Sequence, residues 1–106
     1  MHNMVYLIGR LTSNIEVEEQ GNIVKTTIKI AVQRNFKNEE GIYETDIIPC
    51  MLWNGIATQA SGYCQKGDLV GLKGRIECLN EGFVVVVDKI SFLSSRTSEE
   101  GENNNE

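Results

Sequence analysis

The sequence predicts an all-β fold, a barrel of five strands with one short helix between the third and fourth strands. Apolar and polar side chains alternate in five segments, as they do in strands with one buried face. Helical spacing appears only between residues 56 and 66. With 106 residues the chain is long enough for one hydrophobic core.

The first three strands are predicted within residues 4–53. The first covers 4–11, with Gly9 as a bulge or sharp bend. A charged turn is expected at 15–22, and the second strand runs from Ile23 to about Phe36. A polar loop then leads into the third strand, which ends at Trp53.

The rest of the body is predicted as a helix followed by two strands. The helix begins near Ile56, is weakened by Gly62 and is capped by Gly67. The fourth strand spans 69–78, and its expected inward side chains are Val70, Leu72, Ile76 and Cys78. A tight turn at 80–82 leads into the fifth strand, which starts at Phe83 and runs to about Leu93.

Charge divides the chain into a body, residues 1–94, and an acidic tail, residues 95–106, which we expect to be disordered. The net charge is −5, but Glu99, Glu100, Glu102 and Glu106 all lie in the tail. Without residues 96–106 there remain 11 acids and 9 bases, so the body is nearly neutral. The acidic total therefore does not exclude an anionic ligand.

The cysteines and the hydropathy predict a reduced, cytoplasmic protein without metal. Cys50, Cys64 and Cys78 form no CxxC pair. Cys50 and Cys78 fall on the inward parity of their strands, so we expect buried thiols there. No segment approaches the ~20 apolar residues of a membrane span, and no signal peptide is recognisable. No cofactor is expected.

The third strand is apolar on both faces. Ile48, Cys50 and Leu52 share the parity of the core. The opposite parity consists of Tyr43, Thr45, Ile47, Pro49, Met51 and Trp53. Because a small barrel buries only one face of a strand, the second face must contact a partner subunit or a flat ligand.

The order of three strands, one helix and two strands is that of the OB-fold, a five-stranded Greek-key barrel. In this architecture the face of the second and third strands binds oligonucleotides or oligosaccharides. Here that face includes Trp53, Ile47 and Lys29, while Arg34 and Lys37 flank Phe36. We expect few acidic partners for these three bases, because the carboxylates cluster at 16–19, 39–46 and in the tail.

Four blocks in order resemble one family. They are Val5-Tyr-Leu-Ile-Gly-Arg-Leu-Thr12, Ile30-Ala-Val-Gln-Arg-Asn-Phe36, Thr45-Asp-Ile-Ile48 with Trp53, and Lys66-Gly-Asp-Leu-Val70 with Gly74-Arg75. From about residue 4 to 93 the chain is similar to bacterial single-stranded DNA-binding proteins (SSB). The resemblance implies an OB-fold without catalysis that binds single-stranded DNA in replication, recombination or repair. It also implies a homo-oligomer, with a tetramer favoured over a dimer, associated with the nucleoid.

The predicted binding residues are those whose side chains can stack on bases or neutralise phosphates. They are Trp53, Phe36, Ile47, Lys29, Arg34, Lys37, Lys66, Lys73 and Arg75. Three positions depart from the family pattern: Ile47 stands where an aromatic is usual, Asn54 and Gly55 stand where a base is frequent, and the hairpin at 78–82 is too short for its usual ring. With fewer rings and a short hairpin, we expect a smaller footprint or weaker affinity than in the family. The tail lacks the terminal Pro-Phe of the family, so recruitment of replication or repair proteins stays open.

Two other classes remain at this point. One is an accessory OB protein of the primosomal type, acting mainly as an adaptor between proteins at the replication fork. The other is an OB module for oligosaccharides or proteins. Enzyme classes find little support, because His2 is the sole histidine and no paired carboxylates or phosphate-binding glycine motif occur.

Overall fold

The computed structural model describes residues 1–95, which form six strands and one helix. The elements in chain order are β1 (Val5–Leu11), β2 (Glu18–Gln20), β3 (Ile23–Lys37), β4 (Tyr43–Trp53), α1 (Asn54–Tyr63), β5 (Leu69–Cys78) and β6 (Phe83–Ser94). The predicted acidic tail lies outside the described residues, apart from Ser95.

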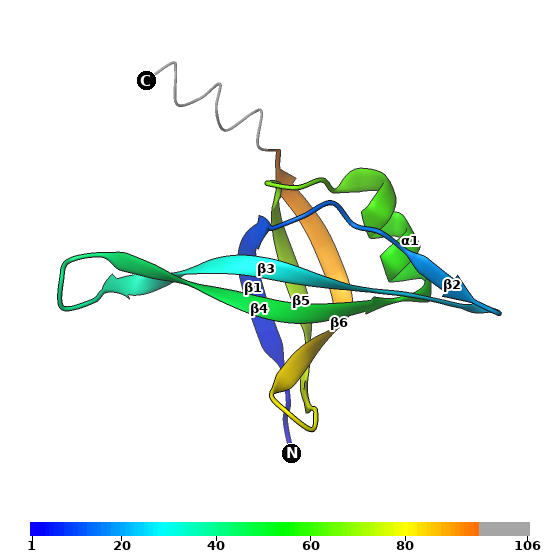
Figure 1. Cartoon of the computed structure of the whole chain (residues 1–106), viewed down its shortest axis with the longest axis horizontal. Coiled ribbons are helices and arrows are strands. Elements are labelled where there is room, and N and C mark those ends of the chain that lie inside the picture. The colour runs from blue at the N-terminus through cyan, green and yellow to red at the C-terminus, as the bar shows by residue number, and fades with distance from the viewer. Residues whose placement is uncertain (96–106) are drawn as a thin grey trace.

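Five of these strands close into a mixed barrel, as the sequence predicted for an OB-fold (Figure 1). The sheet order is β1-β5-β6-β4-β3-β2, and β1 closes the barrel by pairing with β3. This closing contact joins Arg10 to Ala31 and Leu11 to Ile30. All pairings are antiparallel except β4 with β6, which run parallel and meet at Cys50 and Met51.

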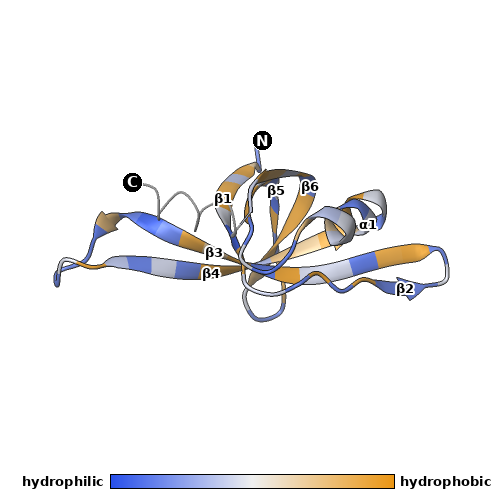
Figure 2. Cartoon of the chain, turned by 90° about the horizontal axis from the view of Figure 1, so that it is seen from above, coloured by the Kyte–Doolittle hydropathy of each residue, from blue (hydrophilic) through white to orange (hydrophobic). Residues whose placement is uncertain are grey.

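The core is formed by the inward parity of the strands and is covered at one end by α1. Ile30, Leu52, Leu72, Val70, Val85 and Cys50 are the largest fully buried side chains. Ala57 and Ala60 are the buried residues of α1. Figure 2 shows that apolar segments concentrate where the strands cross, whereas the outer part of the β3–β4 hairpin carries more polar segments.

Gly9 permits the closing contact, and the bulge, one of the two alternatives predicted for it, is not formed. Residues Val5–Arg10 pair with β5 without a register shift, so β1 is regular there. A Cβ atom at Gly9 would lie 2.5 Å from the carbonyl oxygen of Ala31 and 2.6 Å from Cγ2 of Ile30. The missing side chain therefore allows two backbones to approach each other.

Two predicted boundaries are wrong. The helix ends at Tyr63, not at Gly67, because Cys64 is extended and residues 65–68 form a turn closed by a hydrogen bond from the Asp68 N–H to the Gln65 carbonyl oxygen. In that turn the Gly67 N–H donates to the carbonyl oxygen of Leu11, which ties the end of α1 to β1. The predicted turn at 15–22 contains the short strand β2, which pairs with β3 from Glu18 to Gln20.

Cys50 is buried as predicted, but Cys78 is exposed, so that prediction was wrong. β1 pairs with β5 only as far as Gly74, and beyond it the β5–β6 hairpin projects from the barrel (Figure 1). The inward parity of β5 then has no opposite wall, and Ile76 is exposed as well. Burial raises the pKa of Cys50 to about 12, which keeps its thiol protonated.

Replacing Gly9 with alanine should destabilise the fold. The new methyl group would overlap the Ala31 carbonyl, and such overpacking costs about 1–3 kcal/mol. A melting experiment should show a lower Tm for Gly9→Ala. Gly71→Ala is the matched control, because its Cβ would lie 3.6 Å from Leu93 Cδ1, an ordinary contact. Equal melting of the two variants would contradict the close approach.

Candidate nucleic-acid interface

The long antiparallel pairing of β3 with β4 creates one solvent-facing surface, here named the outer β3–β4 face. Alternation places it opposite the core. Its members face each other in pairs: Lys25 with Trp53, Thr27 with Met51, Lys29 with Pro49, Ala31 with Ile47, and Gln33 with Thr45. Three of the predicted binding residues, Trp53, Ile47 and Lys29, therefore lie together on this face.

Trp53 carries a cation on its ring. The Nζ atom of Lys25 lies 5.6 Å from the ring centroid. This distance is typical of a cation–π contact. Trp53 is 36% exposed, so much of its surface is covered by its own neighbours but part of it faces solvent. The site therefore combines a flat π-surface with an ammonium group at one end of the outer β3–β4 face.

Arg34 is held by two carboxylates, contrary to the expectation of few acidic partners. Its Nε and Nη2 donate to the two carboxylate oxygens of Asp46 at 3.0 and 2.9 Å, and its Nη1 donates to Glu44 Oε1 at 2.7 Å. The hydrogen bond from Arg34 and its charge lower the pKa of Asp46, and the same pairing raises the pKa of Arg34. The charge of Arg34 is thus largely neutralised within the hairpin.

Phe36 and Lys37 lie near the tip of the same hairpin, far from Trp53. The register shifts between Gln33 and Lys37, and Lys37 then pairs with Tyr43. Its Nζ lies 5.7 Å from the Tyr43 ring centroid, which makes a second ring–cation pair. Phe36 is exposed. At about 3.3 Å per residue, the strand separates it from the Trp53 end by roughly 35 Å.

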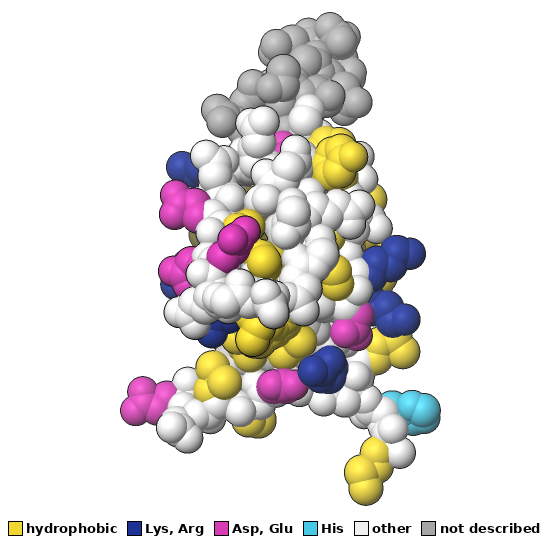
Figure 3. Space-filling model, turned by 90° about the vertical axis from the view of Figure 1, so that its right-hand side faces the viewer, with side chains coloured by type: hydrophobic (Ala, Val, Ile, Leu, Met, Phe, Trp, Pro, Cys, Tyr) yellow, Lys and Arg dark blue, Asp and Glu magenta, His cyan; other side chains and the backbone are white. Residues whose placement is uncertain are grey.

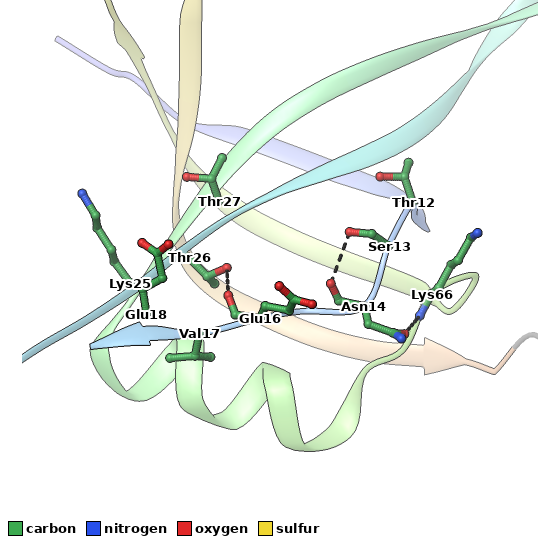
Figure 4. A pocket seen from close by; sticks show the side chains of 10 residues that line it. All are labelled: Thr12, Ser13, Asn14, Glu16, Val17, Glu18, Lys25, Thr26, Thr27 and Lys66. Atoms are coloured by element: carbon green, nitrogen blue, oxygen red, sulfur yellow. Dashed lines mark hydrogen bonds between the residues drawn. The ribbon is translucent and has the colours of Figure 1, made fainter. Parts of the chain in front are cut away.

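Lys66 lies beside a polar groove of about 730 Å³. Figure 4 shows the groove between the segment after β1, the start of β3 and the turn after α1. Its lining residues are Thr12, Ser13, Asn14, Glu16, Val17, Glu18, Lys25, Thr26, Thr27 and Lys66. The Lys66 N–H donates to Asn14 Oδ1, and Thr26 Oγ1 donates to the Glu16 carbonyl, so the walls are fixed by hydrogen bonds. Lys25 connects the groove to Trp53.

Lys73 and Arg75 belong to β5, apart from the outer β3–β4 face. Lys73 pairs with Tyr6 of β1 on one side and Lys89 of β6 on the other. Arg75 forms ion pairs with Glu77 at 3.0 Å and Asp88 at 3.6 Å. The structure therefore does not bring these two bases together with Trp53.

Both signs of charge occur on the end of the molecule that carries α1 and β2. Figure 3 shows acidic and basic side chains there with apolar groups between them. A ligand on this end thus meets side chains of both signs instead of one broad basic patch. Whether an anionic ligand binds at this end therefore depends on which basic side chains share one face with an apolar or aromatic group.

The comparisons with known proteins identify the family. Residues 2–81 match the family model described as the single-strand binding protein family. The chain belongs to this family. It is 38% identical over 111 residues to single-stranded DNA-binding protein 1 of Streptococcus agalactiae, covering 95% of this chain and 68% of the relative. It is 41% identical over 78 residues to single-stranded DNA-binding protein B of Bacillus subtilis, covering 73% and 69%.

A third relative matches nearly the whole chain as well. The single-stranded DNA-binding protein of Oceanobacillus iheyensis is 37% identical over 112 residues, covering 96% of this chain and 70% of the relative. As an SSB family member, the chain binds single-stranded DNA and is not an enzyme. Within residues 1–95, no three His, Cys, Asp or Glu side chains are grouped to hold a metal ion. No helix in the same range is long and apolar enough to cross a membrane.

Sequence reasoning missed Lys25, Glu18 and Gln20. Lys25 has the outward parity of its strand, but its place opposite Trp53 depends on the register between two strands. Glu18 pairs with Lys25, and Gln20 pairs with Ile23, in a strand that the sequence did not predict. Counting back from the hairpin turn would have placed Thr27 opposite Trp53, because the register shifts between Gln33 and Lys37.

Removing the Asp46 carboxylate should change the pH dependence of stability. The folded pKa of Asp46 is lowered, so its ion pair stabilises the fold above the ordinary pKa of about 3.9. This contribution of the ion pair to the free energy of unfolding is lost as the pH falls through the pKa of Asp46 in the folded protein. Asp46→Asn should therefore melt slightly below wild type at pH 7 and equally at pH 2.

Glu81→Gln serves as the control, since it removes one charge at the β5–β6 turn, far from the hairpin. Thermal melts of the three proteins between pH 2 and 7 provide the comparison. A gap between Asp46→Asn and wild type that stays constant with pH would contradict the Arg34–Asp46 assignment.

Proposed function

We propose that the chain binds and protects single-stranded DNA with little sequence preference along the outer β3–β4 face, in replication, recombination or repair. The observation that carries the proposal is the partly exposed Trp53 ring beside Lys25 in a member of the single-strand binding family. Because the proposed ligand is single-stranded DNA, we place this activity in the cytoplasm, at the nucleoid.

The mechanism combines stacking with neutralisation of phosphates. One base stacks on Trp53, which contributes about 1–3 kcal/mol, and neighbouring bases contact Ile47 and Met51. Lys25 and Lys29 neutralise the phosphates, and Lys66 extends the basic path along the groove. Since every base has a π-face, stacking of this kind tolerates any sequence.

At the hairpin tip, Phe36 and Lys37 form a second contact point for the strand. Arg34 acts here mainly by holding the hairpin in shape, because its guanidinium already pairs with Asp46 and Glu44. Lys73 and Arg75 would contact DNA only where the strand continues around the barrel onto β5.

The adaptor alternative is favoured by one observation. Arg34 and Arg75 are both engaged by carboxylates, which reduces the positive charge available for DNA. An adaptor would bind a protein partner tightly and DNA weakly. A salt titration of oligo-dT binding separates the two functions, because phosphate neutralisation makes DNA affinity fall steeply with salt.

Replacing Trp53 should weaken DNA binding without unfolding the protein. Trp53→Ala removes the stacking surface, so the Kd for labelled oligo-dT should rise about 5- to 150-fold, which corresponds to about 1–3 kcal/mol. Fluorescence anisotropy of the labelled oligonucleotide measures the change, and circular dichroism checks the fold.

Tyr63→Ala provides the control, because Tyr63 is an exposed aromatic on α1, off the outer β3–β4 face. It should bind as wild type does. Wild-type affinity in Trp53→Ala would place the binding surface elsewhere, and salt-insensitive binding would favour the adaptor function.

We also propose a homo-oligomer, with a tetramer favoured, that assembles through β1. Residues Val5–Gly9 pair only with β5, which leaves the other edge of this segment open for a strand from a second copy. Tyr6, Ile8 and Leu93 are exposed beside it. An apolar surface next to an open strand edge supports association between subunits.

A charge placed on this surface should separate the subunits. Ile8→Glu would bury a carboxylate in the contact, so sedimentation should find a single chain of 11.9 kDa where wild type sediments as an oligomer. Leu79→Glu adds the same charge at an exposed apolar residue outside β1 and should leave the wild-type mass. An oligomeric Ile8→Glu protein would exclude this contact.

A further inference from the structure

Three adjacent strands place Glu18, Lys25 and Trp53 in one row. Glu18 of β2 pairs with Lys25 of β3, and Lys25 pairs with Trp53 of β4. Gln20 and Ile23 form the next pair on the same side, because they are two positions away from Glu18 and Lys25. Together these five side chains line a cavity of about 110 Å³, here named the Trp53 slot.

The apolar walls of the Trp53 slot suit a flat ring. Trp53 provides one wall, and Ile23, which is half exposed, provides apolar surface beside it. The Lys25 ammonium lies over the Trp53 ring. A base that stacks there displaces this ammonium, which is then available to a phosphate of the same nucleotide.

The polar edge of the Trp53 slot distinguishes bases by their hydrogen-bonding groups. The ionised Glu18 carboxylate only accepts hydrogen bonds, whereas the Gln20 amide both donates and accepts. Cytosine presents its N4 amino group next to the N3 acceptor, and adenine presents N6 next to N1. Thymine presents the O4 acceptor in place of that amino group, with the N3–H donor beside it, so a carboxylate at the exocyclic position is repelled.

From this arrangement we infer that the Trp53 slot reads one base and prefers cytosine or adenine to thymine. Glu18 accepts from the exocyclic amino group, as carboxylates do with cytosine N4. Gln20 donates to the neighbouring ring nitrogen. The inference rests on the proposed DNA binding and adds to it a local preference within an otherwise sequence-tolerant surface.

Glu18→Gln tests this reading directly, because an amide accepts from an amino group and also donates to thymine O4. The probes are labelled oligo-dC and oligo-dT of about 15 nucleotides, within the range of site sizes for OB-folds. The quantity compared is the ratio of Kd for oligo-dT to Kd for oligo-dC. We expect this ratio to be about fivefold higher in wild type than in Glu18→Gln, the low end for a side-chain–base pair.

Glu19→Gln is the matched control. It removes the same charge from the same strand, but Glu19 pairs with Val24 and faces the other side of the sheet. Its ratio should equal that of wild type. Equal ratios in wild type and Glu18→Gln, or the same change in Glu19→Gln, would overturn the base preference while leaving DNA binding intact. If wild type bound neither oligonucleotide, the proposed function itself would fail.

Discussion

The register between β3 and β4 is the constraint on which both the core and the binding surface depend. With Ile28 opposite Cys50 and Ile30 opposite Ile48, one face of the pair enters the barrel. The same register leaves Lys25 and Trp53 together on the outside. A slip by one residue would exchange the two faces, so stability of the core and geometry of the site cannot vary independently.

Local patterns were enough to predict most of the fold. Alternation gave β3 and β4, and Asn54-Gly55 marked the change from strand to helix. The errors concern how far an element extends. Cys78 has the same parity as Leu72, but whether a wall faces it depends on where β1 stops pairing with β5. That length is a tertiary property and leaves no trace in the alternation of β5.

The candidate site was predicted in part for the same reason. The parity of β4 was enough to find Trp53 and Ile47 on one face. Lys25 and the partners of Arg34 required knowledge of which residues lie opposite each other. Asp46, for example, pairs with Val32, which brings its carboxylate beside Arg34, the next side chain of β3 with the parity of Val32. The alternation within one β-strand shows which of its side chains share a face, whereas ion pairs depend on which residues lie opposite each other on neighbouring strands.

Pro49 has a consequence for the solubility of the hairpin. In the described chain, β4 pairs with β6 only at Cys50 and Met51, so the segment before them has one open edge. Ile42 and Ile47 are exposed along that segment. Proline has no N–H to donate, and an added strand would meet a gap in its hydrogen bonds at the point where the open edge begins. One residue thus hinders growth of the β3–β4 hairpin into an intermolecular β-sheet.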